Sequence, residues 1–222
     1  MAARELKVGR REPTSGVVKQ VVIFLHGYGA DGNDLLGLAD PLSAHMPDAL
    51  FLAPDAPEPC PNNPMGHQWF SIPRMDGSSE AESAAGFLRA QEDLNAFLDA
   101  VLEDEGVSAE QVMLIGFSQG TMMSLQVAPR RAEPFAGVIG FSGRMLEPER
   151  LEAEKKAVFP VLLLHGDADP MVPYESMGMA ADALTQAGYP VYTYTMEGTG
   201  HGISPEGLNT AFGFISEFLL KS

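Results

Sequence analysis

A serine, an aspartate and a histidine, each in a segment that follows a strand-like run, could together carry out acyl transfer. Ser118 is the centre of GFSQG at 116–120, Asp169 follows an apolar run that ends at His165, and His201 has a glycine on either side. A serine hydroxyl needs a base to take its proton, and the imidazole needs a carboxylate to hold one tautomer. The chain order Ser, Asp, His accompanies the nucleophile-elbow architecture, so the spacing points to an acyl-enzyme mechanism.

The residues around Ser118 supply the context that this motif requires. An apolar run at 111–115 precedes it and predicts a strand, and the run at 121–128 predicts a helix. The flanking glycines permit a very tight turn that exposes the serine, and the amide of Gln119 would lie at a helix N-terminus as an oxyanion donor. The motif alone is weak, since about 0.1 chance matches are expected per chain of this glycine content. The alternative is a serine that only caps the helix.

The acid and the base each have competitors in the sequence. Asp167 lies two residues before Asp169 and could point the same way, so spacing leaves the two equal. His201 is favoured as the base because it follows the last predicted strand and both acids. The remaining histidines are interpreted as surface, loop or hydrogen-bonded structural residues; they are His26, His45, His67 and His165.

The order of predicted elements indicates one α/β domain over residues 1–222. Apolar strand-like runs alternate with helical patterns, which favours a mostly parallel central sheet with helices on both faces and no large cap domain. Active sites of such sheets form at the carboxyl ends of the strands. The segments that carry Tyr28, Ser118, Asp169 and His201 each follow a predicted strand, so we expect them to meet at that edge.

Two segments fall outside this alternation. Residues 1–16 are polar and could form an edge hairpin, and residues 54–79 are rich in proline and show no regular periodicity. We expect the second segment to be an ordered loop on the substrate side, because it contains the aromatic pair Trp69-Phe70. Trp69 could contact substrate or could anchor the loop to the core, and the two roles are compatible.

Composition limits the partners of the chain. The net charge is −16, which disfavours nucleic acid and stable insertion into anionic membranes, and it suggests that an acyl substrate is held by apolar contact rather than by charge. Cys60 is the only cysteine, which excludes intrachain disulfides and fits a reducing compartment. Neither a secretory signal nor a membrane span is visible. We therefore expect a cytoplasmic protein.

Six ordered blocks resemble the phospholipase/carboxylesterase family of α/β-hydrolases, which includes bacterial carboxylesterases and acyl-protein thioesterases. The resemblance implies Ser118 as nucleophile, Asp169 rather than Asp167 as acid, and His201 as base. It also implies an oxyanion hole from the amides of Tyr28 and Gln119. The blocks are HGYG at 26–29, WF at 69–70, GFSQG at 116–120, FSG at 141–143, HG at 165–166 with DPMVP at 169–173, and GH at 200–201.

The resemblance also implies an apolar acyl groove beside these residues. Candidate lining residues are Trp69, Phe70, Met145, Leu146 and Met171, of which the three aliphatic ones could equally belong to the core. Two positions depart from the family pattern: Tyr28 replaces the leucine of eukaryotic thioesterases, and Ser71 replaces a frequent aspartate.

The function expected is a serine carboxylesterase for small to medium acyl esters, acting on small molecules without a metal or an organic cofactor. The alternatives within this chemistry are an acyl-protein thioesterase and a lysophospholipase, and a peptidase could use the same three residues. A slow-turnover ligand-binding protein that keeps the hydrolase fold is the alternative from a different class. The oligomeric state, including a homodimer, stays open.

Overall fold

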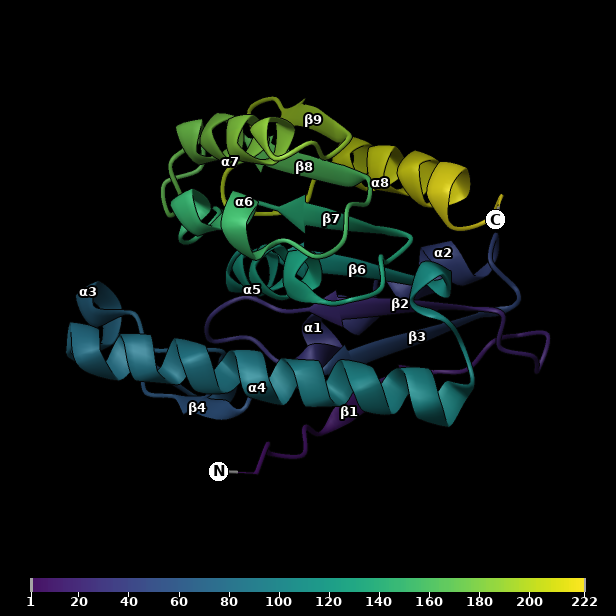
Figure 1. Ribbon diagram of the computed structural model, residues 1–222, viewed down its shortest axis with the longest axis horizontal. Coiled ribbons are helices and arrows are strands. Elements are labelled where there is room, and N and C mark those ends of the chain that lie inside the picture. Colours follow the sequence, from purple (N-terminus) through teal and green to yellow (C-terminus); the bar gives the residue numbers. More distant parts are fainter. Residues whose placement is uncertain (1, 222) are drawn as a thin grey trace.

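The computed structural model describes residues 2–221, and its centre is a seven-stranded sheet in the order β1-β3-β2-β6-β7-β8-β9 (Figure 1). Six strands run parallel, and β1 at the edge is antiparallel to β3. The α/β class expected from the alternating pattern is therefore confirmed. The strands are β1 (Val8–Arg11), β2 (Gln20–Leu25), β3 (Ala49–Pro54), β6 (Val112–Phe117), β7 (Gly137–Phe141), β8 (Val161–Gly166) and β9 (Val191–Met196).

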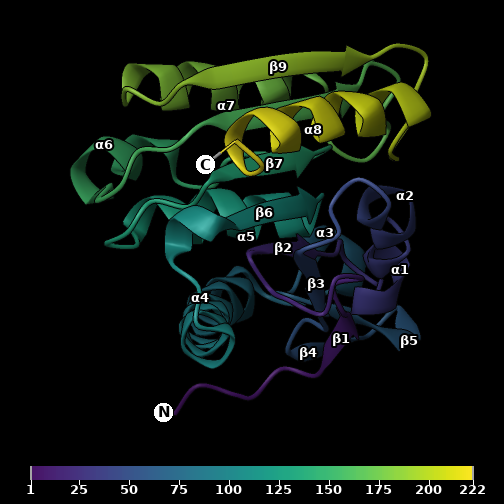
Figure 2. The ribbon, with the colours of Figure 1, turned by 90° about the vertical axis from the view of Figure 1, so that its right-hand side faces the viewer.

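Helices cover both faces of the sheet (Figure 2). Successive side chains of a strand point to opposite faces, so Ile23 and Leu25 of β2 belong to one core cluster and Phe24 to the other. One face carries α4 (Glu80–Glu105), α5 (Gln119–Val127), α6 (Leu151–Glu154) and α7 (Glu175–Gln186). The other carries α1 (Gly32–Leu36), α2 (Ala39–Ser43) and α8 (Pro205–Phe218).

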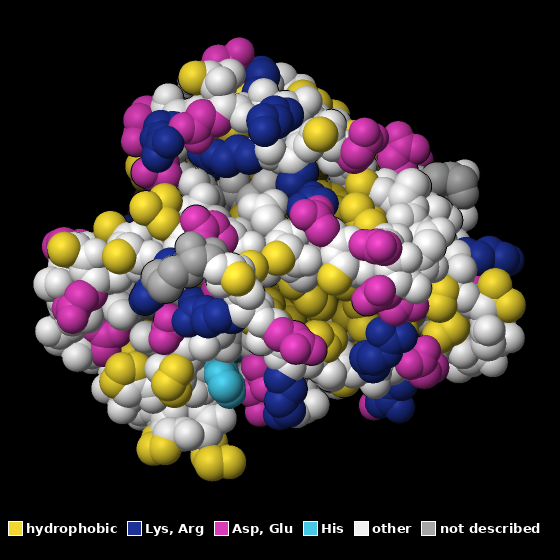
Figure 3. Space-filling view, turned by 60° about the horizontal axis from the view of Figure 1, so that its bottom comes forward, with side chains coloured by type: hydrophobic (Ala, Val, Ile, Leu, Met, Phe, Trp, Pro, Cys, Tyr) yellow, Lys and Arg dark blue, Asp and Glu magenta, His cyan; other side chains and the backbone are white. Residues whose placement is uncertain are grey.

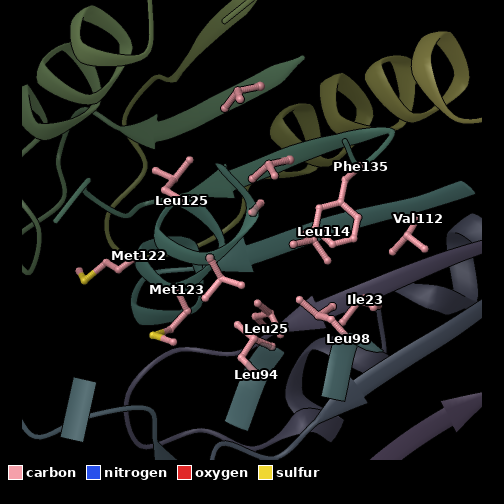
Figure 4. Packing of buried hydrophobic residues seen from close by; sticks show 14 of the residues in the cluster. Ile23, Leu25, Leu94, Leu98, Val112, Leu114, Met122, Met123, Leu125 and Phe135 are labelled. Atoms are coloured by element: carbon pink, nitrogen blue, oxygen red, sulfur yellow. The ribbon is translucent and has the colours of Figure 1, made fainter. Parts of the chain in front are cut away.

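The packing of α4 and α5 fixes the centre of the molecule. Leu94 and Leu98 of α4 are buried and point toward Ile23 and Leu25 of β2, with Met123 of α5 beside them (Figure 4). Full burial of such a side chain stabilises the fold by about 1.5–3 kcal/mol. The strand that precedes Ser118 and the helix that follows it are therefore both held by the core.

The described part of the N-terminal segment, residues 2–16, forms no hairpin, so the expected edge hairpin is wrong there. Its one strand, β1, pairs with β3, from Val8 opposite Pro54 to Arg11 opposite Phe51. The reason is that β3 would otherwise be an edge strand with unpaired backbone groups, and β1 satisfies them.

The expectation that residues 54–79 lack regular elements is also wrong. They contain a two-stranded antiparallel sheet, β4 (Glu58–Cys60) and β5 (Asn63–Gln68), and a short helix, α3 (Pro73–Asp76). The prolines occupy positions that need no backbone N–H: Pro59 and Pro64 lie in a ribbon of two edge strands, and Pro73 is at the start of α3. The segment is ordered, as the aromatic pair suggested.

The strand order reverses direction at β2. From β2 the chain proceeds to β3 on one side, whereas β6 and the later strands lie on the other side. Ligands of open parallel sheets bind outside the carboxyl ends of the strands at such a switch point. The loop after β2 and the turn after β6 meet there, so the fold places Tyr28 and Ser118 at the same edge.

Candidate active site

Ser118 lies in a strained turn between β6 and α5. Its φ is 53° and its ψ is −111°, a backbone conformation that costs about 1–3 kcal/mol outside glycine. The flanking glycines make the turn feasible: a Cβ at Gly116 would lie 2.4 Å from the amide nitrogen of Thr121, and one at Gly120 would lie 1.8 Å from Leu25 O. The side chain of Ser118 does not cap the helix, and the residue is partly exposed.

His201 and Asp169 form a hydrogen-bonded pair from two different loops. His201 Nδ1 lies 2.7 Å from Asp169 Oδ2, and the Asp169 side chain is fully buried. Burial opposes ionisation of this carboxyl, but hydrogen bonds from His201 and from the amides of Val172 and Met171 outweigh it and hold the pKa of Asp169 below its usual value. The Asp169 side chain is therefore a carboxylate that orients the imidazole.

The His201 ring lies beside the nucleophile turn. It packs on the ring of Phe117, the residue before Ser118, with the ring centroids 4.9 Å apart. The structure thus brings Ser118, His201 and Asp169 to one edge of the sheet, in agreement with the positions expected for them.

Asp167, which spacing left equal to Asp169, points elsewhere. Its Oδ1 accepts a hydrogen bond from Gly198 N at 2.7 Å, and the residue is exposed. Asp167 therefore holds the loop that leads to His201. Within residues 2–221 it has no hydrogen bond to the His201 imidazole, which pairs with Asp169.

The two histidines that end buried strands are structural, as interpreted from sequence. His26 is fully buried, with Nδ1 2.8 Å from Gly27 O and Nε2 accepting from Ala56 N. Burial lowers the pKa of His26, so its ring is neutral. His165 Nε2 lies 3.0 Å from Val172 O and 3.3 Å from Asp169 Oδ2, which places it behind the acid rather than at the surface.

The loop after β2 lies directly against the nucleophile turn. A Cβ at Gly27 would be 3.3 Å from the Cβ of Ser118. The next amide, that of Tyr28, makes no hydrogen bond within residues 2–221, nor does the amide of Gln119 at the first position of α5. These two N–H groups are the donors that the family resemblance assigns to an oxyanion.

The β4–β5 ribbon supports this loop from outside. Gly29 N donates to His67 O at 2.8 Å, and His67 N donates to Ala30 O at 2.7 Å, which extends β5 onto the loop. The Asn63 side chain adds a bond to Gly29 O at 2.8 Å. The position of the Tyr28 amide thus depends on a segment that was expected to be irregular.

Trp69 is an anchor. Its side chain is fully buried, and its indole N–H donates to His26 O at 3.0 Å. The Gln119 side chain holds the same segment, because its oxygen accepts from Trp69 N at 2.9 Å and its amide group donates to Phe70 O at 2.7 Å. Of the two roles weighed for Trp69, the structure favours the anchoring one.

Two cavities flank the turn. The first, which we call the arginine cleft, has a volume of about 360 Å³ and is lined by Phe70, Ile72, Arg74, Met122, Arg144 and Met171, among others. The second, the leucine cleft, has about 310 Å³ and includes Leu35, Leu38, Phe117 and Ile203. A further cavity of about 330 Å³ between the N-terminal segment and α4 is lined by none of the expected site residues, and Figure 3 shows the apolar floor of a hollow on that face.

The expected substrate-lining residues divide into two groups. Phe70 and the exposed Met171 line the arginine cleft. Met145 and Leu146 are half-buried, pack against the core and line neither cleft, which is the alternative that the sequence left open. Sequence reasoning missed Arg74 and Arg144, although Arg144 directly follows the FSG block at 141–143 and could have been noted for that reason.

Comparisons with known proteins agree with this geometry. The phospholipase/carboxylesterase family model matches residues 12–219. Acyl-protein thioesterase 1 of Neurospora crassa is 31% identical over 90% of this chain and 87% of its own length, and esterase YpfH of Escherichia coli is 30% identical over 87% and 80%. The crystal structure of esterase PE8 superposes with a TM-score of 0.92 at 38% identity, covering 97% of this chain and all of the other.

No helix within residues 2–221 is both long and apolar enough to cross a membrane. The seven-stranded sheet, the serine turn after β6 and the match over residues 12–219 lead to the same conclusion. The chain belongs to the phospholipase/carboxylesterase family of α/β-hydrolases.

Proposed function

We propose that this chain is a serine carboxylesterase that hydrolyses small to medium acyl esters through an acyl-enzyme on Ser118. The observation that carries the proposal is the 2.7 Å bond between His201 Nδ1 and the buried Asp169 carboxylate, beside a serine in a strained turn. A bond at Nδ1 leaves Nε2 of the imidazole for proton transfer.

The reaction proceeds in two halves. His201 Nε2 takes the Ser118 proton as Oγ attacks the acyl carbon, and the amides of Tyr28 and Gln119 donate to the oxyanion that forms. The tetrahedral adduct collapses, the C–O bond to the alcohol breaks, and His201 returns the proton to the leaving alcohol. Water then attacks the acyl-enzyme with His201 again as base, which releases the acid and restores Ser118.

The strain at Ser118 supports the role of nucleophile. A backbone held at φ 53° is kept only when its surroundings determine it, and here the Ser118 amide donates to Phe141 O at 2.8 Å while its carbonyl accepts from Met122 N at 3.1 Å. Both backbone groups are therefore fixed, and the side chain is left free to face the substrate.

Ser118→Ala tests the proposal. We expect kcat/KM for 4-nitrophenyl butyrate to fall by about 10⁴-fold or more while the variant stays folded, because no other group can form the acyl-enzyme. Ser124→Ala is the matched control: Ser124 is on the same helix and donates only to Gly120 O in that helix. Turnover retained by Ser118→Ala would overturn the assignment.

A thioesterase is the second candidate, since a relative that is 31% identical is named acyl-protein thioesterase 1. The same acyl-enzyme would form from a thioester, and only the leaving group differs. Paired oxygen and thiol esters of the same acyl group separate the two functions: a carboxylesterase gives the larger kcat/KM with the oxygen ester.

A further inference from the structure

The arginine cleft holds an unusual share of the unpaired positive charge of this acidic protein. Eleven of the fourteen lysines and arginines form an ion pair with a carboxylate of residues 2–221. Within the same range, the three that do not are Arg74, Arg144 and Lys156. Two of these three line one cavity, and it is the cavity beside Ser118.

Both guanidinium groups have donors to spare. Arg74 makes one side-chain hydrogen bond, from Nη2 to Met171 O at 3.0 Å, and Arg144 makes none within the described part of the chain. A guanidinium offers five N–H donors in a planar fork that fits a carboxylate through two parallel bonds. The chain has thirty acidic residues, and yet these two arginines in one cleft have no carboxylate partner within residues 2–221. Their guanidinium groups are therefore available to bind a carboxylate of a substrate.

The nearest competitor for these groups is an acid on the rim. Glu80, the first residue of α4, also lines the cleft. Within residues 2–221 it forms no ion pair with Arg74 or Arg144. Its side chain is exposed, so water screens it. The rest of the lining is mainly apolar, from Phe70, Ile72 and Met122, with two serines, Ser71 and Ser83, and it contains no second acidic residue.

The cleft adjoins the turn that carries Ser118, because residues at its wall contact the Ser118 backbone. A Cβ at Gly143 would lie 3.0 Å from Ser118 O, and Arg144 is the next residue. Met122, on the wall of the cleft, donates its amide to Ser118 O. Met171, on the opposite wall, has its amide fixed by the Asp169 carboxylate. A carboxylate bound by the arginines can therefore belong to the same molecule whose ester lies at Ser118.

We propose that the substrates of this enzyme are esters that also carry a carboxylate, which Arg144 binds with help from Arg74. The proposal rests on the serine esterase function and names its substrate class, of which the half-esters of dicarboxylic acids are the simplest members. It departs from the sequence-based expectation that, at a net charge of −16, apolar contact holds the substrate more than charge does. Distant acids are screened within about 8–10 Å, whereas the two arginines face the cleft directly.

The first arm of the test places the carboxylate on the acyl side. Mono-4-nitrophenyl adipate is compared with its neutral carboxamide, 4-nitrophenyl 5-carbamoylpentanoate, with the uncatalysed rate of each subtracted. We expect kcat/KM of the wild type to be at least about 10-fold higher for the acid, since a charged bidentate contact exceeds one neutral hydrogen bond by about that factor.

The second arm places the carboxylate on the leaving group. 4-Carboxyphenyl acetate is compared with 4-carbamoylphenyl acetate, whose leaving groups have similar size. A preference for the acid in either arm supports the proposal and tells which half of the ester enters the arginine cleft. A wild-type ratio near one or below in both arms overturns it.

Variants assign the preference to its residues. Arg144→Gln should lower the acid-to-amide ratio by about 10-fold through a loss of kcat/KM that is larger for the acid than for the amide, and Arg74→Gln should lower the ratio by a smaller factor. Lys156→Gln is the control, because Lys156 is equally unpaired in the described chain but lies outside the cleft. An equal loss on acid and amide in Arg144→Gln would show a structural effect and would contradict recognition.

The experiment separates failure of this proposal from failure of the esterase function. Ser118→Ala must abolish hydrolysis of the neutral amide-bearing ester if the chain is a serine esterase. If that holds while the wild type shows no preference for acids, only the substrate class is wrong. Added salt is a second readout, and 0.5 M NaCl should reduce the acid-to-amide ratio of the wild type while leaving that of Arg144→Gln nearly unchanged.

Discussion

The two sides of Ser118 are built from different parts of the polypeptide. On the side of β8 and β9, the groups proposed to act are side chains: the His201 imidazole and the Asp169 carboxylate, joined at 2.7 Å. On the side of β2, the groups proposed to act are backbone amides, those of Tyr28 and Gln119. Buried hydrogen bonds from Trp69 and from the Gln119 side chain hold the segments around them.

This difference decides how each side responds to substitution. A side chain that transfers or orients a proton is removed by one mutation, and the chemistry goes with it. A backbone donor cannot be removed by changing its own side chain, and it can only be displaced by loosening what holds it. We therefore expect large kinetic losses with intact stability on the β8–β9 side, and smaller kinetic losses coupled to lost stability on the β2 side.

Among the residues on the two sides of Ser118, the largest effect is expected for Asp169→Asn. The amide cannot hold His201 in the working tautomer or stabilise its charged form, so kcat/KM for 4-nitrophenyl butyrate should fall by about 10³–10⁴-fold. Asp167→Asn is the matched control, and we expect a loss below about 10-fold because Asp167 binds only Gly198 N. Steady-state kinetics of the two variants checks this prediction. A larger loss in Asp167→Asn would show that Asp167, and not Asp169, is the acid.

An intermediate effect is expected for Gln119→Met. The change keeps the Gln119 backbone donor but leaves the buried Trp69 N and Phe70 O without their partner, which costs about 1–3 kcal/mol for each group. The free energy of unfolding should fall by about 2–4 kcal/mol, and kcat/KM by about 10–100-fold as the site shifts. Denaturant unfolding and kinetics measure the two losses together.

Gln186→Met is the control for that experiment, since Gln186 is exposed at the end of α7 and its side chain has no hydrogen bond among those of residues 2–221. It should change neither quantity by more than about 0.5 kcal/mol or twofold. A Gln119→Met variant with native stability and a 10⁴-fold loss of kcat/KM would contradict the expectation that kinetic losses on the β2 side are smaller and accompany lost stability.

The smallest effect is expected for Trp69→Phe. The substitution removes the indole bond to His26 O and leaves a cavity at a fully buried site, so the free energy of unfolding should fall by about 1–3 kcal/mol, with little effect on kcat/KM. Because the Trp69 side chain is fully buried, the relative rates with esters of increasing acyl chain length should stay unchanged. A shifted chain-length preference would instead indicate that Trp69 contacts the substrate.

The sequence predicted the β8–β9 side better than the β2 side. Ser118 and His201 follow strands in a recognisable order, and the parallel sheet brings the ends of those strands together. The choice of Asp169 over Asp167 needed the structure or the family, because a two-residue offset on a loop does not tell which carboxylate turns inward. In the structure Asp167 accepts from Gly198 N at 2.7 Å, whereas His201 Nδ1 lies 2.7 Å from Asp169 Oδ2, which favours Asp169.

The β2 side depends on contacts that leave little trace in a single sequence. The β4–β5 ribbon was not predicted because Pro59 and Pro64 interrupt the strand pattern in the sequence. Both prolines are nevertheless compatible with a ribbon of two edge strands. The bond from Gln119 to the Trp69-Phe70 segment joins two distant stretches through one amide side chain. The arginine cleft was missed for the same reason, because Arg74 and Arg144 meet only after folding.

Covalent labelling tests the central claim most directly. The protein is treated with a fluorophosphonate, which forms a stable phosphonyl ester with an activated serine, and the adduct is mapped by mass spectrometry alongside residual esterase activity. The account predicts one adduct per chain, on Ser118, with activity lost in step with labelling and no adduct in Ser118→Ala. Labelling at another residue, or full labelling of Ser118 with activity retained, would contradict it.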